Sequence, residues 1–511
     1  MQIRLRTAAP RAGEAVALPV AQGAAVPEAF GAKAAAAGFT GAVGTMLALF
    51  TPDPVILAGT GAAATPLDFE RAGGAAIAAI GDLPALVLDA RGLPPDQAAA
   101  FAAGAMLRGT AQHVIRSAPS AKPPPKVELL TSGAADIVPP WRAAEAAVRG
   151  TLYARDLVTA PANDLTPASF AKWLRGLEEH GIKVTVIGPK QLRRRGFGAL
   201  SAVGREAASG PRLVTLRWKG RLDARPVAFI GKGLCFDTGG ISIKPAAGME
   251  EMRADMAGAA ACAGAMLALA LRCSPAPAMA VLAIAENATG GDSFRPGDVL
   301  RTASGRTVEV IDTDAEGRLV LADALHHARQ HRPQAMIDLA TLTGSIVTAL
   351  GHHRAGLFGN DAPLAAALVA AGLVVGEPLW PMPIGARHRE DLASGIADIK
   401  QCAAAGSGAF GGRLLPDACH AAAFLREFAG PMPWAHLDIA GVETRAEADD
   451  LGPKGASGFR ARLLDRLVAM RFEATPIGCR MAAPMRTMPS TNRSCWRPRT
   501  RHLPMARDSC C

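Results

Sequence analysis

Acidic residues crowd into one short turn of this chain, between a strand-like run and a helix-like run. In the segment VEVIDTDAEGRL, Asp314 and Glu316 lie two positions apart and Arg318 follows two positions later. Carboxylates beside a buried strand cost free energy unless a cation holds them, and divalent metal ions prefer such hard oxygen ligands. The alternative is an ordinary helix N-terminus, where an acid complements the helix dipole. That alternative explains either acid alone, but not a second charged stretch upstream.

The second stretch, PVAFIGKGLCFDTGGISIKPAAGMEEMRADMAGAA, also begins with an apolar strand-like run. Its charged residues, which fall on the strand end, the glycine-rich loop and the following helix pattern, include Lys232, Asp237, Lys244 and Asp255. Each residue also has an ordinary structural interpretation. In the order given, these are a snorkelling surface lysine, a turn residue, a solvated charge and a residue on an exposed helix face. Taken together with the first stretch, the four residues predict one functional site.

Both stretches belong to a region where β-branched apolar runs alternate with helix patterns. The runs are 184–187, 227–230, 280–284, 308–311 and 335–339, and the helix patterns are 169–179, 249–271 and 317–331. This alternation predicts an α/β fold whose catalytic domain has a largely parallel central sheet flanked by helices. Because ligands bind beyond the carboxyl ends of such strands, we expect the segments after these strands to converge on one crevice.

The length of 511 residues predicts more than one domain. Residues 1–140 mix strand-like and alanine-rich helix patterns and predict a smaller, variable N-terminal α/β domain, which ends at the break Pro139-Pro140. Residues 141–471 are the predicted catalytic domain, with a connecting helix over 141–157. Residues 472–511 lack helix or strand periodicity and predict a disordered basic tail.

The formal net charge of +10 is concentrated in that tail, where the residues from Ala474 onward hold seven arginines and one acid. An arginine-rich arm binds phosphates, so we expect nucleic acid as a partner only through the tail; the simpler interpretation is an extension without selected structure. Cysteines outside the tail show no disulfide or ligand-like spacing, and the N-terminus shows no secretion signal. No apolar run reaches about 20 residues, which argues against a membrane span. We therefore expect a cytoplasmic protein.

Several longer motifs carry a resemblance to a known family. The runs GKGLCFDTGGISIKP, EEMRADMAGAA and DTDAEGRLVLADAL, with ARDLVTAPANDLTP, IDLATLTG and WAHLDIAG, resemble the signatures of the cytosol (leucyl) aminopeptidase family. The resemblance covers residues 154–469. It implies a metal-dependent hydrolase that releases N-terminal, preferably leucine-like, amino acids from peptides with a free N-terminus. It also implies a homohexamer.

Carried onto this chain, the resemblance implies two divalent metal ions per subunit, manganese or zinc. Asp237 and Glu316 would bridge the two ions. Asp314 would complete one site, and Asp255 with the amine of Lys232 would complete the other. Lysine binds a metal only as the neutral amine, which a neighbouring dication favours.

The resemblance also implies a catalytic pair, Lys244 and Arg318, that binds no metal. A protonated lysine stabilises an oxyanion, and the guanidinium fork would hold a bicarbonate that acts as general base. The positions that match the family's substrate pocket are Met252, Thr341, Leu342 and Gly344. An apolar pocket favours leucine- or methionine-like side chains, with a discrimination of about 1–3 kcal/mol per methylene.

Three features depart from the family's pattern. Asp312 stands where the motif Asn-Thr-Asp-Ala-Glu-Gly-Arg begins with asparagine, and Thr238 replaces the usual serine. Segment 402–420 departs from the family's asparagine followed by a glycine- and alanine-rich stretch. Its charged or polar residues, expected near the substrate pocket, include Arg413, Asp417 and His420. This segment keeps a second hypothesis open, a catalytically impaired member that acts as an oligomeric scaffold or a nucleic-acid binder.

Two other enzyme classes fit the sequence poorly. The run Gly231-Lys232-Gly233 after a strand suggests a phosphate-binding loop, but the spacing G-x-x-x-x-G-K-[ST] is absent. The pairs His326-His327 and His352-His353 lack the H-E-x-x-H spacing of histidine zinc proteases. We interpret these pairs as surface or interface histidines.

Overall fold

The computed structural model describes residues 1–50, 53–112, 115, 117, 124–133, 135–403 and 417–473, and every structural statement below concerns these residues. Met1–Glu473 forms one compact unit. The expected disorder of the tail from Ala474 onward and the expected position of Arg413 lie outside the described residues.

The N-terminal part of the chain forms a six-stranded sheet with the order β1-β6-β5-β2-β4-β3. The strands are β1 (Ile3–Arg6), β2 (Ala15–Ala21), β3 (Met46–Leu49), β4 (Val55–Gly61), β5 (Ala85–Asp89) and β6 (Lys126–Leu130). Neighbouring strands are parallel except β3 and β4. The connecting helices are α1 (Glu28–Ala36), α2 (Pro66–Ala78) and α3 (Pro95–Gly109). The α/β character predicted for this part is confirmed.

Helix α4 (Val138–Thr159) leads from the first sheet to the second, as expected for the connecting helix. Pro139 and Pro140 lie in its first turn rather than breaking the chain, because the fixed φ and missing N–H of proline suit a helix start. A Cβ at Gly150 would lie 2.3 Å from the Gly264 carbonyl oxygen, so these glycines allow α4 to pack closely on α8 (Ala257–Leu271). The domain boundary at residue 140 stays a prediction.

The larger part contains an eight-stranded sheet with the order β15-β14-β17-β13-β9-β10-β8-β7. The strands are β7 (Lys183–Ile187), β8 (Arg212–Trp218), β9 (Val227–Asp237), β10 (Ala278–Asn287), β13 (Ala335–Ala340), β14 (Ala355–Gly359), β15 (Leu379–Pro381) and β17 (Trp434–Asp438). The four central strands β17, β13, β9 and β10 are parallel, and antiparallel neighbours flank them. The predicted largely parallel central sheet is confirmed.

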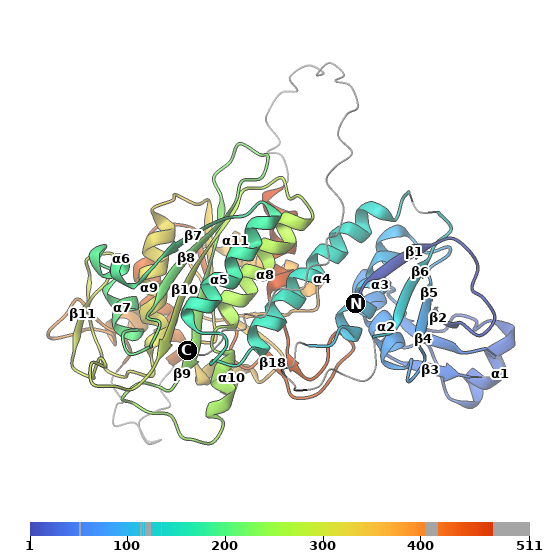
Figure 1. Cartoon of the computed structure of the whole chain (residues 1–511), viewed down its shortest axis with the longest axis horizontal. Helices are drawn as coiled ribbons and strands as arrows, with labels where there is room; N and C mark the ends of the chain where they lie inside the picture. Colours follow the sequence, from blue (N-terminus) through green and yellow to red (C-terminus); the bar gives the residue numbers. More distant parts are fainter. Residues whose placement is uncertain are drawn as a thin grey trace, which may run out of the picture. The chain divides into compact units, whose positions relative to one another are not determined.

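Helices cover both faces of this sheet (Figure 1). The apolar side chains of β10 alternate between two core layers, with Leu282 in one and Val281 in the other. The first layer includes residues of α4, α8, α11 (Ala362–Val374) and α14 (Ala461–Leu467), and the second includes residues of α7 (Gly198–Val203), α9 (Glu316–Arg329) and α13 (Asp417–Ala429).

The remaining short elements are α5 (Pro167–Arg175), η1 (Gly176–His180), α6 (Pro189–Arg194), α10 (Gly344–Leu350), α12 (Ala386–Glu390), β18 (Thr444–Arg445), β19 (Gly455–Ala456) and η3 (Val468–Phe472). Among the described helices, the stretch Met249–Leu271 is long and apolar enough to pass as a membrane span, but 94% of its apolar window is buried inside the fold. That burial is typical of a core helix.

Two predicted elements differ from the structure. Segment 308–311, expected in the central sheet, instead gives β12 (Thr307–Glu309), which lies between β11 (Val299–Arg301) and β16 (Ile399–Lys400) in a separate sheet. Apolar periodicity predicts a strand but not its partner, so the error is one of pairing. The helix expected over 249–271 starts as the 3-10 helix η2 (Met249–Ala254) and continues as α8. Asp255 therefore lies in the turn between them.

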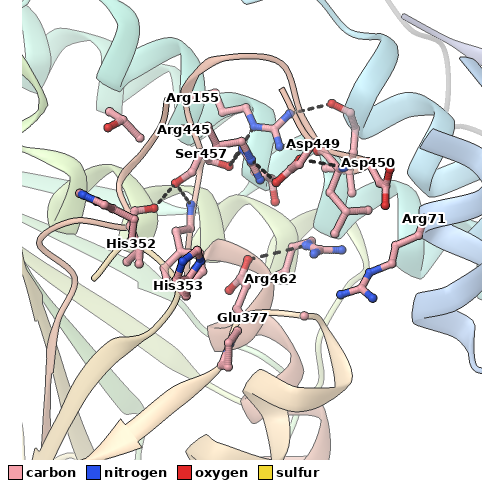
Figure 2. Close-up of a pocket in the computed structure, with 18 residues that line it drawn as sticks. Arg71, Arg155, His352, His353, Glu377, Arg445, Asp449, Asp450, Ser457 and Arg462 are labelled. Carbon is pink, nitrogen blue, oxygen red and sulfur yellow. Dashed lines mark hydrogen bonds and ion pairs between the residues drawn. The ribbon is translucent and has the colours of Figure 1, made fainter. Parts of the chain in front are cut away.

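A polar pocket of about 290 Å³ lies beside α4, and we call it the arginine pocket (Figure 2). Its arginines are Arg71, Arg155, Arg445 and Arg462. Arg155 is 2% exposed, and its three nitrogens donate to the backbone carbonyls of Ser457, Leu107 and Leu451 at 3.0, 2.7 and 2.8 Å. This side chain ties the end of α3 to the segments around β19.

Candidate metal centre

Strand β9 carries two of the expected site residues, Lys232 in its middle and Asp237 at its carboxyl end. The strand lies between β13 and β10, and both of its faces are buried. A Cβ at Gly231 would lie 2.5 Å from the Cα of Ala259, so this glycine gives α8 room to pack against the strand. The close packing brings Lys232 next to Asp255, which precedes α8.

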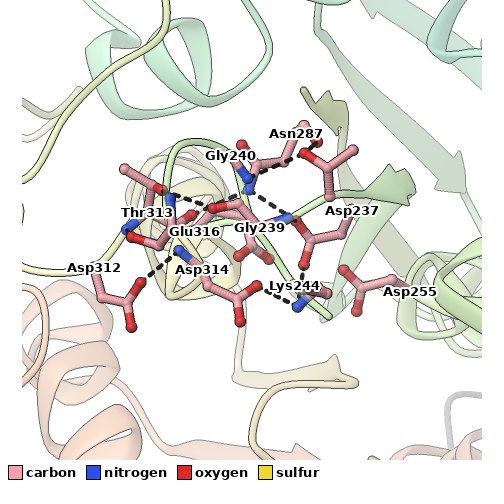
Figure 3. A network of polar contacts seen from close by, with 12 residues as sticks. Asp237, Gly239, Gly240, Lys244, Asp255, Asn287, Asp312, Thr313, Asp314 and Glu316 are labelled. Carbon is pink, nitrogen blue, oxygen red and sulfur yellow. Dashed lines mark hydrogen bonds and ion pairs between the residues drawn. The ribbon is translucent and has the colours of Figure 1, made fainter. Parts of the chain in front are cut away.

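The carboxylates of Asp237, Asp255 and Glu316 converge on one point (Figure 3). One oxygen of each lies within 4.8 Å of the others, and all three residues are buried. Glu316 is the first residue of α9. Lys232 Nζ lies 2.7 Å from Asp255 Oδ1 and 3.0 Å from Glu316 Oε1. The structure therefore brings four of the five expected metal ligands together from three separate segments.

Three buried oxygens of this cluster have no hydrogen-bond partner among the described residues: Asp255 Oδ2, Glu316 Oε1 and Glu316 Oε2. The Lys232–Glu316 contact is an ion pair without hydrogen-bond geometry. An unpaired buried polar group costs about 1–3 kcal/mol, and more when it is charged. Converging orphan oxygens beside one amine fit a divalent cation, because hard oxygen donors are its preferred ligands.

The titration behaviour of the cluster follows from its burial. Burial, together with the charge of Asp237, raises the pKa of Glu316 to about 8. Burial also raises the pKa of Asp255 to about 6, against the opposing charge of Lys232. Burial opposes the charged form of Lys232, but Asp255, Glu316 and Asp237 outweigh this effect and raise the lysine pKa. Because metal ligands must be deprotonated, metal binding here releases protons.

Asp314 and Lys244 lie at the less buried edge of the cluster. Lys244 Nζ is 2.9 Å from Asp237 Oδ2 and also contacts Asp314 Oδ1. Asp312 Oδ1 accepts the Asp314 N–H at 2.9 Å (Figure 3). The carboxyl group at position 312 thus serves as a local turn acceptor, a task that the expected asparagine oxygen also performs.

Two polar residues that the sequence patterns did not single out fix this geometry. The Asn287 amide donates to Asp237 Oδ1 at 2.8 Å and to the Thr313 carbonyl oxygen at 3.1 Å. The Thr313 hydroxyl donates to the Gly239 carbonyl oxygen at 2.6 Å, where a φ of +85° favours glycine. Asn287 ends strand β10, and that strand-end position is the signal that could have identified it.

Arg318 lies in the first turn of α9 and is 2% exposed. Its Nη2 donates to Asp417 Oδ1 at 2.8 Å, and its Nη1 donates to the Gln401 carbonyl oxygen at 3.3 Å. The guanidinium therefore holds a carboxylate of its own chain where the resemblance implied bicarbonate. Most of the divergent segment, residues 404–416, lies outside the described residues.

A cavity of about 440 Å³ adjoins the cluster, and we call it the metal-side cavity. Its wall includes Lys244, Asp314, Arg318, Leu342, Gly344 and Asp417. Thr341 lies at the ligands themselves, since its hydroxyl donates to Asp255 Oδ1 at 2.7 Å and its carbonyl accepts from Lys232 Nζ at 2.9 Å. Met252 lies on η2 and is not among the described residues of the wall.

The loop that carries Leu342 and Gly344 is held by Asp438 at the end of β17. Asp438 Oδ1 accepts the Leu342 N–H at 3.1 Å, and Oδ2 accepts the Thr343 hydroxyl at 2.7 Å. Asp438 is fully buried. Asp438 thus positions the cavity wall, although the sequence singled it out only as part of the motif WAHLDIAG.

Comparison with known proteins places this geometry in context. A model of the cytosol aminopeptidase family, catalytic domain, matches residues 152–465. The probable cytosol aminopeptidase of Brucella melitensis is 42% identical over 455 residues, which cover 86% of this chain and 92% of that protein. The probable cytosol aminopeptidase of Rhizobium meliloti is 42% identical over 492 residues, covering 91% and 97%.

Solved structures show the same similarity. The bottromycin maturation enzyme BotP in complex with Mn is 34% identical, with a TM-score of 0.80, and the match covers 90% of this chain and 99% of that chain. A mutant of tomato leucine aminopeptidase is 29% identical, with a TM-score of 0.81 and coverage of 92% and 97%.

Proposed function

This chain belongs to the cytosol aminopeptidase family and is a metal-dependent aminopeptidase, and we propose that it uses two divalent ions to release N-terminal leucine-like residues from peptides. The observation that carries the proposal is the set of buried, unpaired oxygens on Asp255 and Glu316, next to Asp237 and Lys232. Such a cluster is costly without a cation. The manganese complex of BotP supports manganese as one of the ions.

In this proposal the five ligands divide between the two ions. Asp237 shares Lys244 with Asp314, and Glu316 shares Lys232 with Asp255, while both acids lie in one group with Asp255, which supports a bridging role for the two. Bound divalent ions supply Lewis acidity toward a peptide carbonyl and toward water. The remaining chemistry falls to the side chains around them.

Lys244 is the proposed oxyanion stabiliser. Its ammonium faces Asp237 and Asp314 at the edge of the metal-side cavity, and it is 19% exposed. Burial opposes its charge, but Asp237, Glu316 and Asp314 raise its pKa, so the side chain stays protonated at neutral pH. A fixed cation beside the reacting carbonyl stabilises negative charge that develops in the transition state.

The proposed substrate preference rests on the cavity wall. Leu342 and Gly344 offer an apolar and an open position there, while Thr341 lies at the proposed metal ligands. Met252 remains a proposed specificity residue on η2, outside the described wall. A wall of this kind prefers leucine over smaller side chains by about 1–3 kcal/mol per methylene.

The assembly and location of the protein are also part of the proposal. We propose a homohexamer in the cytosol, which is supported by family membership and by the relatives' name, cytosol aminopeptidase. Sedimentation or light scattering of the purified full chain tests the hexamer.

The function is tested with a pair of peptides that differ only at the first amine, Leu-Gly-Gly and its N-acetyl form. Chelator-stripped protein is assayed with and without added manganese. We expect release of leucine from the free peptide only, and only with metal. Folded protein that binds manganese but cleaves neither peptide would favour the scaffold hypothesis instead.

A further inference from the structure

The Arg318 guanidinium is a buried cation at the wall of the metal-side cavity, and its carboxylate partner comes from its own chain. Within the described residues, Asp417 is the one acid that forms an ion pair with it, at 2.8 Å. The Arg318 side chain is 2% exposed and the Asp417 side chain 38% exposed. The partly exposed Asp417 carboxylate thus pairs with a guanidinium that is almost fully buried.

The surrounding structure fixes Asp417 at this place. It is the first residue of α13, and the following N–H, of Ala418, donates to Ser345 Oγ at 2.9 Å. One turn later, His420 is 2% exposed and its Nε2 lies 3.0 Å from Asp391 Oδ2. Both Asp417 and His420 line the metal-side cavity.

A guanidinium fork at a cavity wall is a binding site for a small planar anion, because it presents parallel N–H donors to two oxygens. Here Nη1 donates to the Gln401 carbonyl oxygen and Nη2 to Asp417, while Nε has no partner. Both Nη nitrogens are therefore already engaged, and a bicarbonate at Arg318, as the resemblance implies, does not fit this arrangement.

We propose that Asp417 is the resident carboxylate of this site and takes the place of an exogenous anion at Arg318. The inference rests on the proposed peptidase function. A carboxylate there accepts the proton that water loses as its oxygen bonds to the peptide carbon, and gives that proton to the amine nitrogen as the C–N bond breaks. Substrate, water and Asp417 account for every atom and proton of this step.

The test compares Asp417→Ala and the isosteric Asp417→Asn with a matched control, Asp391→Asn. Asp391 is a 53% exposed carboxylate that pairs with His420 and does not touch Arg318 in the structure. Each manganese-loaded protein is assayed in carbonate-free buffer while bicarbonate or formate is titrated.

We expect the parent protein and Asp391→Asn to be insensitive to either anion. Both Asp417 variants should lose about 100-fold in kcat, within the range for a lost general base. Millimolar formate or bicarbonate should restore Asp417→Ala at least ~10-fold, since an anion site is vacated. Asp417→Asn, whose amide still fills the space, should not respond.

A second readout does not depend on catalysis. In metal-free protein, formate should raise the melting temperature of Asp417→Ala but not that of the parent protein, since binding to the folded state stabilises it. If the parent protein cleaves no peptide, the proposed function fails while this binding test still decides the role of Asp417. Parent protein that bicarbonate stimulates, or an Asp417→Ala variant that retains full rate and binds no anion, would overturn the inference.

Discussion

Two clusters of buried charge in this molecule differ in whether their polar atoms have partners within the protein. In the arginine pocket, every side-chain nitrogen of Arg155 donates to a backbone carbonyl, and Arg445 pairs with Asp449 at 2.7 Å (Figure 2). Arg462 pairs with Glu70 at 2.5 Å. In the metal centre, carboxylate oxygens of Asp255 and Glu316 point at one another without partners (Figure 3). Arg155, Arg445 and Arg462 have partners within the protein, whereas Asp255 Oδ2 and both carboxylate oxygens of Glu316 have no hydrogen-bond partner among the described residues.

This difference gives a criterion that distinguishes a structural charge cluster from a functional one. Burial lowers the pKa of Arg155 to about 9, helped by the charge of Arg445, so strong perturbation alone does not identify a functional site. The metal centre differs in that three of its buried carboxylate oxygens lack hydrogen-bond partners among the described residues. These negatively charged ligands are suited to a cation.

Removing a proposed bridging ligand should have the largest effect. Glu316→Ala deletes both orphan oxygens of one carboxylate at the centre of the cluster. We expect peptidase activity to fall by at least ~100-fold, because even partners of metal ligands cost 10–100-fold when lost. Elemental analysis should show a loss of bound metal at the same time. A variant that keeps its metal and its rate would remove Glu316 from the site.

Lys244→Met should separate catalysis from metal binding. The lysine contacts two proposed ligands but is not itself one of them in our proposal. We expect kcat to fall by about 100- to 1,000-fold, the usual cost of a lost oxyanion donor, while metal content stays near that of the parent protein. Loss of the metal together with the rate would show that Lys244 acts by holding Asp237 and Asp314 in place.

Arg155→Met should affect stability and leave the chemistry intact. The change strands three backbone carbonyl oxygens in a buried pocket, so we expect a loss of about 3 kcal/mol in the free energy of unfolding. Chemical denaturation measures it. The matched control is Arg149→Met on the same helix, 43% exposed and paired with Glu145, which should change stability by less than about 0.5 kcal/mol. An inactive but stable Arg155 variant would contradict the assignment.

Metal removal should make the free energy of unfolding depend on the protonation of Asp255 and Glu316. Folding raises the pKa of Asp255 to about 6 and of Glu316 to about 8, mainly through burial, with Asp237, Lys232 and Lys244 facing them. The folded acids hold their protons more tightly than the unfolded chain does, so the stability of metal-free protein should fall as pH rises from about 4 to about 8, by about 1–2 kcal/mol between pH 6 and 8. Saturating manganese should abolish the share of the fall that Asp255 and Glu316 contribute, while the share of Asp323, whose pKa burial raises to about 7, should remain. Metal-free protein with a flat profile between pH 6 and 8 would count against the cluster as described.

The sequence predicted the position of a site residue best where that residue lies at the end of a strand. Asp237 could be placed because it ends β9, and the carboxyl ends of parallel strands meet at one edge of a sheet. Lys232 lies in the middle of β9 and Glu316 follows a strand of a separate sheet, so their placement came from the resemblance of their motifs. Contacts between distant segments escaped this reasoning: Asp417 reaches Arg318 across 99 positions, and Asp438 reaches Leu342 across 96. Local periodicity also predicted β12 without its partners. No local pattern encodes such pairings, since tertiary packing selects them.

The most direct test of the account is the metal content of the protein itself. Chelator-stripped full-length chain is titrated with manganese while bound metal and hydrolysis of leucine p-nitroanilide are measured together. Our account predicts two ions per subunit, with activity that rises as they bind and is lost in Asp314→Ala. Folded protein that binds no divalent ion, or that hydrolyses the substrate fully without one, would contradict it.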